Sequence, residues 1–238
     1  MAAGKTKTLI DIKMVDYKYP NGVYALKNVN VQIKKGDFVF VIGRTGSGKS
    51  TFIKMLYREV KPNKGHVILD GADIARLKDH NVYKIRRKIG VVFQDYRLLP
   101  KLTVYENVAF ALEVVGEAPK NIRMKVLRAL ELVGLKHKTR SFPNELSGGE
   151  QQRVAIARAI VNNPNVLICD EATGNLDPEK SIEIMEILNN VNKKLGTTII
   201  MATHDKAIVN KYKKRVLVMK NGEIVKDEEK GTYKDEDI

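Results

Sequence analysis

The chain has 238 residues, of which 43% are hydrophobic and 29% charged, and this balance favours a globular protein over disordered or fibrous classes. Its longest uninterrupted hydrophobic runs have five residues, as in Phe38–Ile42. A helix needs about 20 apolar residues to cross a bilayer, so no membrane-spanning segment is expected. The first residues lack the apolar core of a signal peptide, which predicts a cytoplasmic protein. The single cysteine, Cys169, excludes an internal disulfide.

The net charge is +14, from 42 Lys and Arg against 28 Asp and Glu. Residues 226–238 oppose it with six acids against three lysines, and we expect them to form an acidic tail. Such a basic chain favours polyanionic partners: nucleic acid, an anionic membrane surface or nucleotide phosphates. Because the basic residues are spread along the chain, the charge is equally compatible with a well-solvated surface.

Short β-rich segments separated by turn signals open the sequence, and the third leads into a glycine-rich stretch. From Val104 to about Val133 the apolar residues follow a helical spacing. Apolar β-rich runs then alternate with helical segments, as in parallel sheets, and Asn221-Gly222 predicts a hairpin turn before a last strand near Ile224. The sequence therefore predicts an α/β core interrupted by a helical insertion. Besides the last strand near Ile224, strands are expected at Leu9–Val15, Val29–Ile33, Phe38–Ile42, Val166–Cys169, Thr198–Ala202 and Val216–Met219.

The glycine-rich stretch fits the phosphate-loop pattern G-x-x-x-x-G-K-[ST] and lies between a predicted strand and a predicted helix, which is the context this motif requires. Glycines let backbone N–H groups approach phosphate oxygens, and the helix N-terminus adds a positive dipole. Lys49 is predicted to neutralise β- and γ-phosphate charge, and Ser50 to ligate Mg²⁺. The motif consists of Gly43, Arg44, Thr45, Gly46, Ser47, Gly48, Lys49 and Ser50.

Two acids, Asp170 and Glu171, end the apolar run Val166–Cys169. They would emerge at the carboxyl edge of the sheet, where α/β folds bind ligands, beside the phosphate loop. Asp170 is predicted to hold Mg²⁺ through water. Glu171 is predicted to orient or deprotonate the attacking water in nucleoside triphosphate hydrolysis.

Three further residues lie in or directly after predicted strands. His204 is placed to contact a γ-phosphate or the water near it, although a lone histidine at a strand end is more often a surface residue. Gln94 follows Val91-Val92-Phe93 and can sense Mg²⁺ or water without adding charge. Cys169 lies inside its strand and is predicted to be a small core residue.

A further motif begins at Leu146 and reads LSGGEQQR. It resembles the LSGGQ-type signature of ATP-binding cassette (ABC) ATPases, and the resemblance covers nearly the whole chain. Ser147 and the glycines Gly148 and Gly149 would open a helix whose N-terminus can face an anion. The resemblance implies an ABC-type α/β domain that binds ATP and Mg²⁺, with an N-terminal antiparallel β region. It also implies a head-to-tail homodimer in which the signature of one chain closes over the ATP held by the other.

The same resemblance implies roles for individual residues. Gln94 corresponds to the Q-loop glutamine and His204 to the switch histidine, which together with Glu171 form the catalytic set. Gly174–Asp177 corresponds to the D-loop, which communicates across the dimer. Tyr19 resembles the aromatic residue that stacks on adenine, and Thr51 is placed to contact the α-phosphate. Ser50, Gln94 and Asp170 correspond to the Mg²⁺ site. Ala172 is a departure, because many relatives carry proline after the catalytic glutamate.

Length narrows the choice within the family. A chain of 238 residues has no room for the long coiled coils of DNA-maintenance members or for two cassettes, which leaves a stand-alone ATPase subunit that docks on a separate membrane permease. The domain is expected to comprise a core of residues 1–93 and 160–238 and a helical lobe of about 94–159.

The segments Val92–Val108, Tyr19–Leu26 and Thr173–Pro178 resemble the cell-division subfamily of these ATPases. That resemblance implies coupling of ATP hydrolysis to a permease that controls peptidoglycan hydrolysis, at the inner face of the membrane beside its anionic lipids. Alternatives are a lipoprotein-release or macrolide-type exporter, which would share the catalytic residues, and a nucleic-acid-dependent ATPase. No nucleic-acid partner is expected.

Overall fold

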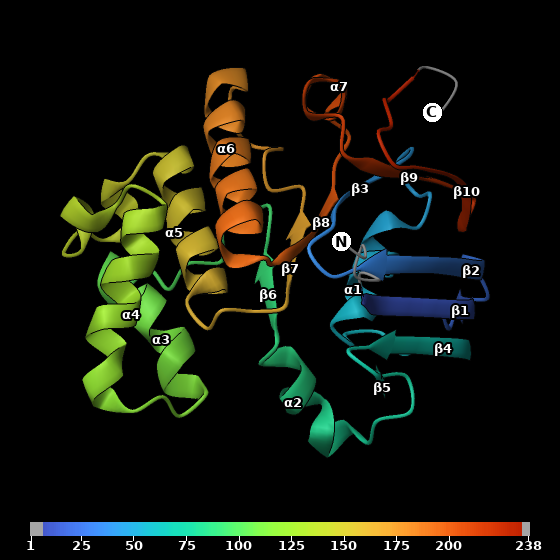
Figure 1. Ribbon diagram of the computed structural model, residues 1–238, viewed down its shortest axis with the longest axis horizontal. Coiled ribbons are helices and arrows are strands. Elements are labelled where there is room, and N and C mark those ends of the chain that lie inside the picture. Colours follow the sequence, from blue (N-terminus) through green and yellow to red (C-terminus); the bar gives the residue numbers. More distant parts are fainter. Residues whose placement is uncertain (1–6, 235–238) are drawn as a thin grey trace, which may run out of the picture. The chain divides into compact units, whose positions relative to one another are not determined.

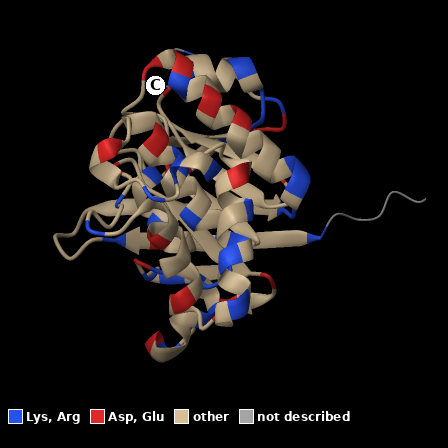
Figure 2. Ribbon diagram, turned by 90° about the vertical axis from the view of Figure 1, so that its left-hand side faces the viewer, with Lys and Arg blue, Asp and Glu red and all other residues tan. Residues whose placement is uncertain are grey.

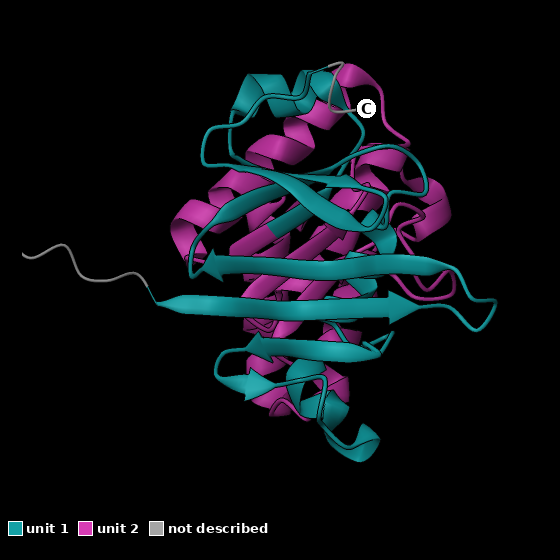
Figure 3. Cartoon of the chain, turned by 90° about the vertical axis from the view of Figure 1, so that its right-hand side faces the viewer, with its two compact units in different colours: residues 1–86, 200–238 teal, residues 87–199 magenta. Residues whose placement is uncertain are grey.

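The computed structural model describes residues 7–234, and the chain divides into two compact units (Figure 3). Unit 1 contains the residues up to Arg86 and those from Ile200 onward, whereas unit 2 is the continuous stretch Arg87–Ile199. The predicted helical lobe, about 94–159, lies within unit 2, which also contains one pair of parallel strands and a further long helix. The boundary between the units falls inside strand β8, Thr198–Ala202, whose five residues are all buried.

Unit 1 contains a four-stranded antiparallel sheet in the order β2-β1-β4-β5 (Figure 1). Its two long strands alternate buried and exposed residues over part of their length, so that one face packs on the core and the other meets solvent. They confirm the first two predicted strands and extend them, while β4 and β5 were not predicted. The strands are β1 Thr8–Lys18, β2 Tyr24–Lys34, β4 Lys64–Leu69 and β5 Ala72–Asp73.

A second group of strands in unit 1 is built around β3, Phe38–Ile42, which is buried along its whole length. It pairs in parallel with β9, Arg215–Lys220, and β9 pairs antiparallel with β10, Glu223–Glu228. Asn221 and Gly222 connect β9 to β10 with φ angles of 51° and 85°, which is the left-handed pair that a tight hairpin turn requires. The predicted hairpin is therefore confirmed.

The helices of unit 1 are short. They are α1 Lys49–Leu56, α2 Val82–Arg86 and α7 Lys206–Tyr212, with a 3₁₀ turn at Asp79–Asn81. The predicted acidic tail begins inside β10, where Asp227 accepts hydrogen bonds from Arg215 at 2.7 and 2.8 Å. Residues 226–228 are therefore part of the sheet, and residues 235–238 lie outside the described part of the chain.

Unit 2 combines two parallel strands with four helices. Strand β6, Ile89–Val92, pairs with β7, Val166–Asp170, and both are largely buried. Helices α3 Val104–Val114, α4 Pro119–Leu132 and α5 Gly148–Ile160 pack against one another, and α5 also contacts α6 Pro178–Leu195. Short 3₁₀ turns occupy Lys136–Lys138 and Pro143–Glu145. The helical block predicted from Val104 to Val133 is confirmed. Among residues 7–234, no helix has the length and apolar character needed to cross a bilayer.

Candidate functional site

The phosphate loop of unit 1 runs from the end of β3 at Ile42 to the start of α1 at Lys49, so the predicted strand–loop–helix context is confirmed. Gly43 and Gly48 have φ angles of 144° and 106°, which L side chains rarely adopt. A Cβ on Gly43 would lie 2.2 Å from the Met219 carbonyl oxygen, and one on Gly48 would lie 2.5 Å from that of Ala25. Glycine is therefore required at both positions.

Lys49 and Ser47 give this loop its polar chemistry. Lys49 is only 8% exposed, and its ammonium group donates to the carbonyl oxygens of Gly43 at 2.7 Å and Arg44 at 3.0 Å. Ser47 Oγ is buried and makes no hydrogen bond within the described residues. A hollow of about 320 Å³ lies beside the loop, lined by Arg44–Ser47 and Met219–Asn221. A cation and an unsatisfied buried hydroxyl at one loop are suited to an anionic oxygen.

Tyr19 and Thr51, both predicted to contact nucleotide, are brought together in unit 1. The Tyr19 hydroxyl and Thr51 Oγ1 are 2.8 Å apart, and Thr51 is buried in α1. Tyr19 is 38% exposed, and its ring packs edge-on against Tyr17 with 5.0 Å between ring centroids. The hydroxyl thus anchors the ring to the helix that follows the phosphate loop, while part of the ring remains accessible.

His204 follows β8 and is exposed. The preceding residue, Thr203, donates its backbone N–H to the Val41 carbonyl of β3 at 3.1 Å. His204 therefore leaves the sheet next to the end of β3, from which the phosphate loop also starts. Asp205 caps α7 by accepting the N–H of Ile208 at 3.0 Å, and this cap positions the turn that carries the histidine.

In unit 2, Gln94 and Glu171 follow the carboxyl ends of two paired strands. Val92 of β6 is opposite Cys169 of β7, so both residues leave the same edge of the pair. A Cβ built on Gly174 would lie 3.2 Å from Gln94 Nε2 and 3.4 Å from Glu171 Oε2. The amide and the carboxylate thus converge on Gly174, and Asp170 is the last residue of β7.

The signature residues begin α5. Ser147 caps this helix, with its hydroxyl accepting the Glu150 N–H at 3.3 Å and its own N–H donating to the Glu150 carboxylate at 2.9 Å. A Cβ on Gly148 would lie 3.0 Å from the Tyr96 hydroxyl, and one on Gly149 would lie 3.3 Å from the Lys180 side chain. Asp177 caps α6 by accepting the Lys180 N–H at 2.9 Å.

Three residues to which the sequence analysis assigned no individual role hold these segments in place. Gln152, buried in α5, donates from Nε2 to the Ala172 carbonyl at 2.6 Å, directly after Glu171. Asn175 and Gln94 exchange two hydrogen bonds of 3.1 and 3.2 Å. Arg158 donates to the carbonyls of Tyr96 and Arg97 at 2.9 and 2.6 Å, and burial lowers its pKa. A signal did exist for Gln152, because it is a polar residue next to the apolar positions of a helix.

Cys169 is fully buried in β7, as predicted for a core residue. Burial is the main cause that raises the pKa of its thiol far above the ordinary value, and the charge of Asp170 adds to the shift. The thiol is therefore neutral and has no part in the chemistry of the site.

The candidate residues are distributed over both units. Unit 1 carries Tyr19, Gly43–Gly48, Lys49, Ser50, Thr51 and His204, and unit 2 carries Gln94, Ser147, Gly148, Gly149, Asp170, Glu171 and Asp177.

The model of the ABC transporter family matches residues 26–174. Among solved structures, a dimeric post-hydrolysis state of the ATP-binding cassette MJ0796 bound to ADP and phosphate is 38% identical, with a TM-score of 0.84 over 94% of this chain and 100% of that chain. The protein cbiO1 of Clostridium perfringens, part of the ABC transporter complex cbiONQ, is 37% identical, with a TM-score of 0.87 over 93% and 88%. The chain belongs to the ABC transporter family and has the mixed α/β fold of its ATP-binding, ATP-hydrolysing cassettes.

Within that family, the chain is similar to a cell-division ATPase. The cell division ATP-binding protein FtsE of Bacillus subtilis (strain 168) is 59% identical over 225 residues, which are 94% of this chain and 98% of that protein. The two chains are therefore alike over almost their whole length.

Proposed function

We propose that the chain is the ATP-hydrolysing subunit of a cell-division complex of the FtsE/FtsX type. In such a complex, cytoplasmic ATP hydrolysis is coupled to an integral-membrane, FtsX-like permease that controls peptidoglycan hydrolysis. The observation that carries this proposal is the 59% identity to FtsE of Bacillus subtilis over 98% of that protein. The catalytic part of the proposal is supported by the geometry of the phosphate loop and of the strand ends in unit 2.

The nucleotide would be held by unit 1. Backbone N–H groups of Gly43–Gly48 and the N-terminus of α1 favour the phosphates, and Lys49 compensates β- and γ-phosphate charge. Lys49 already lies over the loop through its bonds to Gly43 and Arg44, so little reorganisation is needed. Thr51 would contact the α-phosphate, and Tyr19 would stack on adenine with its hydroxyl held by Thr51.

Hydrolysis would depend on Glu171 as the general base for water, with Gln94 and His204 orienting the water and the γ-phosphate. The donor set of Ser50, Gln94 and Asp170 fits Mg²⁺, because a hydroxyl, an amide oxygen and a carboxylate are hard oxygen ligands. When bound, Mg²⁺ would neutralise charge on the β- and γ-phosphates. Asp170 would hold it through water.

The site would be completed by a second copy of the chain. The solved relative MJ0796 is dimeric in its ADP- and phosphate-bound state. We infer that Ser147, Gly148 and Gly149 of one copy close over the ATP of the other. Asp177, which caps α6 at the end of the D-loop, would lie at the junction of the two copies. The N-terminus of α5 supplies a favourable dipole for the γ-phosphate.

The substitution Glu171→Gln tests the catalytic proposal. It keeps the shape of the side chain but removes the base, so ATP hydrolysis should fall by about two to four orders of magnitude. MgATP should then trap a dimer, which size-exclusion chromatography with light scattering would detect. Glu186→Gln, an exposed acid on α6, serves as the matched control and should behave as the parent chain. A Glu171→Gln chain that stays monomeric with MgATP would contradict the two-copy site.

The partner proposal is tested by affinity purification of the tagged chain from gently solubilised native membranes, followed by mass spectrometry. Recovery of a small permease with a large extracytoplasmic loop, together with division proteins, is expected. Recovery of a lipoprotein-release or macrolide-export permease instead would leave the ATPase chemistry intact and overturn the cell-division role.

A further inference from the structure

Helix α4 has two faces of different character. Val126, Ala129 and Leu130 are buried and pack toward the interior of unit 2. The opposite side presents a stripe at the i, i+3, i+4, i+7 and i+8 positions of a helical surface. We call it the α4 stripe; it consists of Lys120, Arg123, Met124, Leu127 and Arg128, which line one hollow of about 550 Å³ with Glu131 and Lys136. Met124 is 61% exposed in its middle.

This part of the chain is strongly basic. Residues 119–140 contain seven Lys or Arg and one acid, whereas the 18 residues of α6 contain three of each sign. The positive charge is therefore concentrated locally and does not simply reflect the composition of every helix. Figure 2 marks the Lys and Arg positions of the chain in blue and the Asp and Glu positions in red.

Only some of these cations are paired. Lys125, Lys136 and Lys138 form ion pairs with Glu117, Glu131 and Glu150. The other four cations make no hydrogen bond, ion pair or ring contact with any residue of 7–234. They are Lys120, Arg123, Arg128 and Arg140, all of which are exposed.

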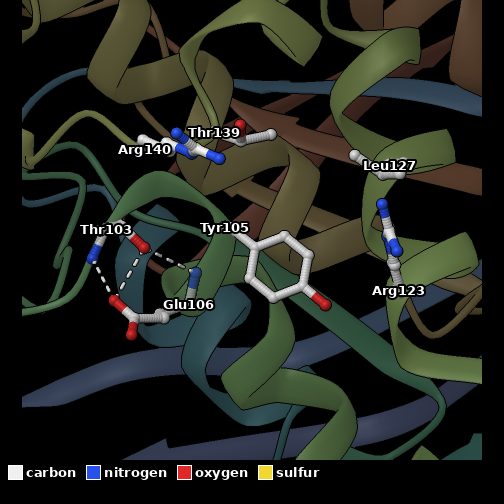
Figure 4. Close-up of a pocket in the computed structure, with 7 residues that line it drawn as sticks. All are labelled: Thr103, Tyr105, Glu106, Arg123, Leu127, Thr139 and Arg140. Atoms are coloured by element: carbon white, nitrogen blue, oxygen red, sulfur yellow. Dashed lines mark hydrogen bonds between the residues drawn. The ribbon is translucent and has the colours of Figure 1, made fainter. Parts of the chain in front are cut away.

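A second hollow of about 300 Å³ adjoins the stripe and shares Arg123 and Leu127 with it. In the view of Figure 4, the Tyr105 side chain lies between those of Arg123 and Arg140, with Thr139 nearby. Two arginines and three hydroxyl residues, Thr103, Tyr105 and Thr139, thus line one depression, and bidentate guanidinium donors suit phosphate oxygens.

The acid that lines this second hollow is already engaged. Glu106 accepts the N–H of Thr103 at 2.8 Å and its hydroxyl at 2.7 Å, as part of the cap of α3. The first backbone N–H groups of α3 are engaged too, since Val104 and Tyr105 donate to the carbonyls of Ser141 and Thr139. An incoming anion would therefore meet the side chains of Arg123, Arg140, Tyr105 and Thr139.

We propose that the α4 stripe, together with Arg140, is a docking surface for a membrane that contains anionic phospholipids. A headgroup phosphate would occupy the hollow between Arg123 and Arg140, and Met124 and Leu127 would contact the apolar boundary of the bilayer. Cations around an exposed apolar centre on one helix face are the composition of an interfacial helix, and an anionic leaflet attracts them. This inference rests on the proposed function, in which the chain works beside a membrane permease.

The test is vesicle binding by the full chain, with anionic phosphatidylglycerol vesicles compared with neutral phosphatidylcholine vesicles at low salt. The variant Lys120→Gln, Arg123→Gln, Arg128→Gln, Arg140→Gln should bind anionic vesicles at least tenfold more weakly, because each cation near an anionic surface contributes about fivefold. The control variant changes Lys27, Lys35, Lys193 and Lys194 to Gln. These cations are also exposed and make no side-chain bond within the described residues, so the control has the same net charge and should lose less than about twofold.

Further measurements test the apolar contact of the stripe and distinguish its effect from that of net charge. Met124→Ser keeps every charge and should weaken the binding that survives at high ionic strength, where charge attraction is screened. Equal loss in the stripe and control variants would overturn the proposal, because net charge would then be the cause. A stripe effect on DNA or polyglutamate binding without one on vesicles would also overturn it. ATP hydrolysis measured on the same variants distinguishes failure of this surface from failure of the catalytic site.

Discussion

Glu171 has a left-handed backbone conformation, with φ 51°, which costs a non-glycine residue about 1–3 kcal/mol. The next residue is Ala172, whose φ angle is not fixed by a ring as that of a proline would be. Here the turn is held by hydrogen bonds. The Gly174 N–H donates to the Glu171 carbonyl at 2.9 Å, and Gln152 donates to the Ala172 carbonyl at 2.6 Å. Gln152 is therefore a positioning residue for the proposed base.

Gln152→Met tests this role, because methionine keeps the length of the side chain and removes the donor. The kcat for ATP hydrolysis should fall about tenfold, with little change in KM because the nucleotide contacts lie elsewhere. Loss of a buried hydrogen bond should also lower the free energy of unfolding by about 1–3 kcal/mol. Steady-state ATPase assays and thermal unfolding measure both.

The control for that substitution is Ile156→Val in the same helix, a buried position where the change costs about 0.5–1.5 kcal/mol. If Ile156→Val lowers kcat as much as Gln152→Met does, general destabilisation explains the effect. An unchanged kcat in Gln152→Met would show that the Ala172 carbonyl needs no partner for catalysis.

At the scale of elements, α5 connects three functional segments of unit 2. Its N-terminus carries the signature residues, Gln152 in its second turn holds the segment after Glu171, and Arg158 near its end holds Tyr96 and Arg97. Tyr96 and Arg97 both have left-handed backbones, with φ of 59° and 48°, and they directly follow the segment of Gln94. A shift of α5 would therefore displace both the proposed base Glu171 and the segment that follows Gln94.

Two helices of unit 2 begin with the same reciprocal cap. Glu106 at α3 and Glu150 at α5 accept backbone N–H bonds from Thr103 and Ser147, and these bonds are the main cause that lowers the pKa of each carboxyl. A carboxyl whose folded pKa is below its unfolded value stabilises the folded state at neutral pH. That stabilisation is lost as the pH falls from about 4.5, the ordinary value, through the folded pKa.

Acidification from about pH 5 to pH 3.5 should therefore lower the Tm of the double variant Glu106→Gln, Glu150→Gln less than that of the parent chain. Glutamine can form the same cap but does not titrate. Circular dichroism melts at several pH values measure the difference. Glu186→Gln, which changes an exposed acid outside any cap, is the control and should follow the parent curve. Parallel curves for all three chains would mean that the caps do not contribute to the acid sensitivity.

Across the whole molecule, local sequence signals predicted the elements that depend on contiguous residues. The buried run Phe38–Ile42, the phosphate loop after it and Lys49 at the helix start could all be identified, because strand, glycines and cation are adjacent in the chain. Strand β4 was missed because it opens with Lys64-Gly65-His66, which carries no apolar alternation. The contacts of Gln152 and Arg158 were missed for another reason: their partners are 20 to 62 residues away in the sequence, which no local pattern encodes.

The arrangement of the two units has a consequence for synthesis on the ribosome. Unit 2 is one continuous stretch, but unit 1 pairs β3 with β9, whose first residue follows Ile42 only after the whole of unit 2. At typical elongation rates of 5–20 residues per second, that interval lasts roughly 10 to 30 seconds. Until then the five apolar residues of β3 lack their parallel partner β9, while unit 2 already has all of its residues. The nascent chain should therefore complete its later unit first, and β3 is the segment that a chaperone would need to shield in the meantime.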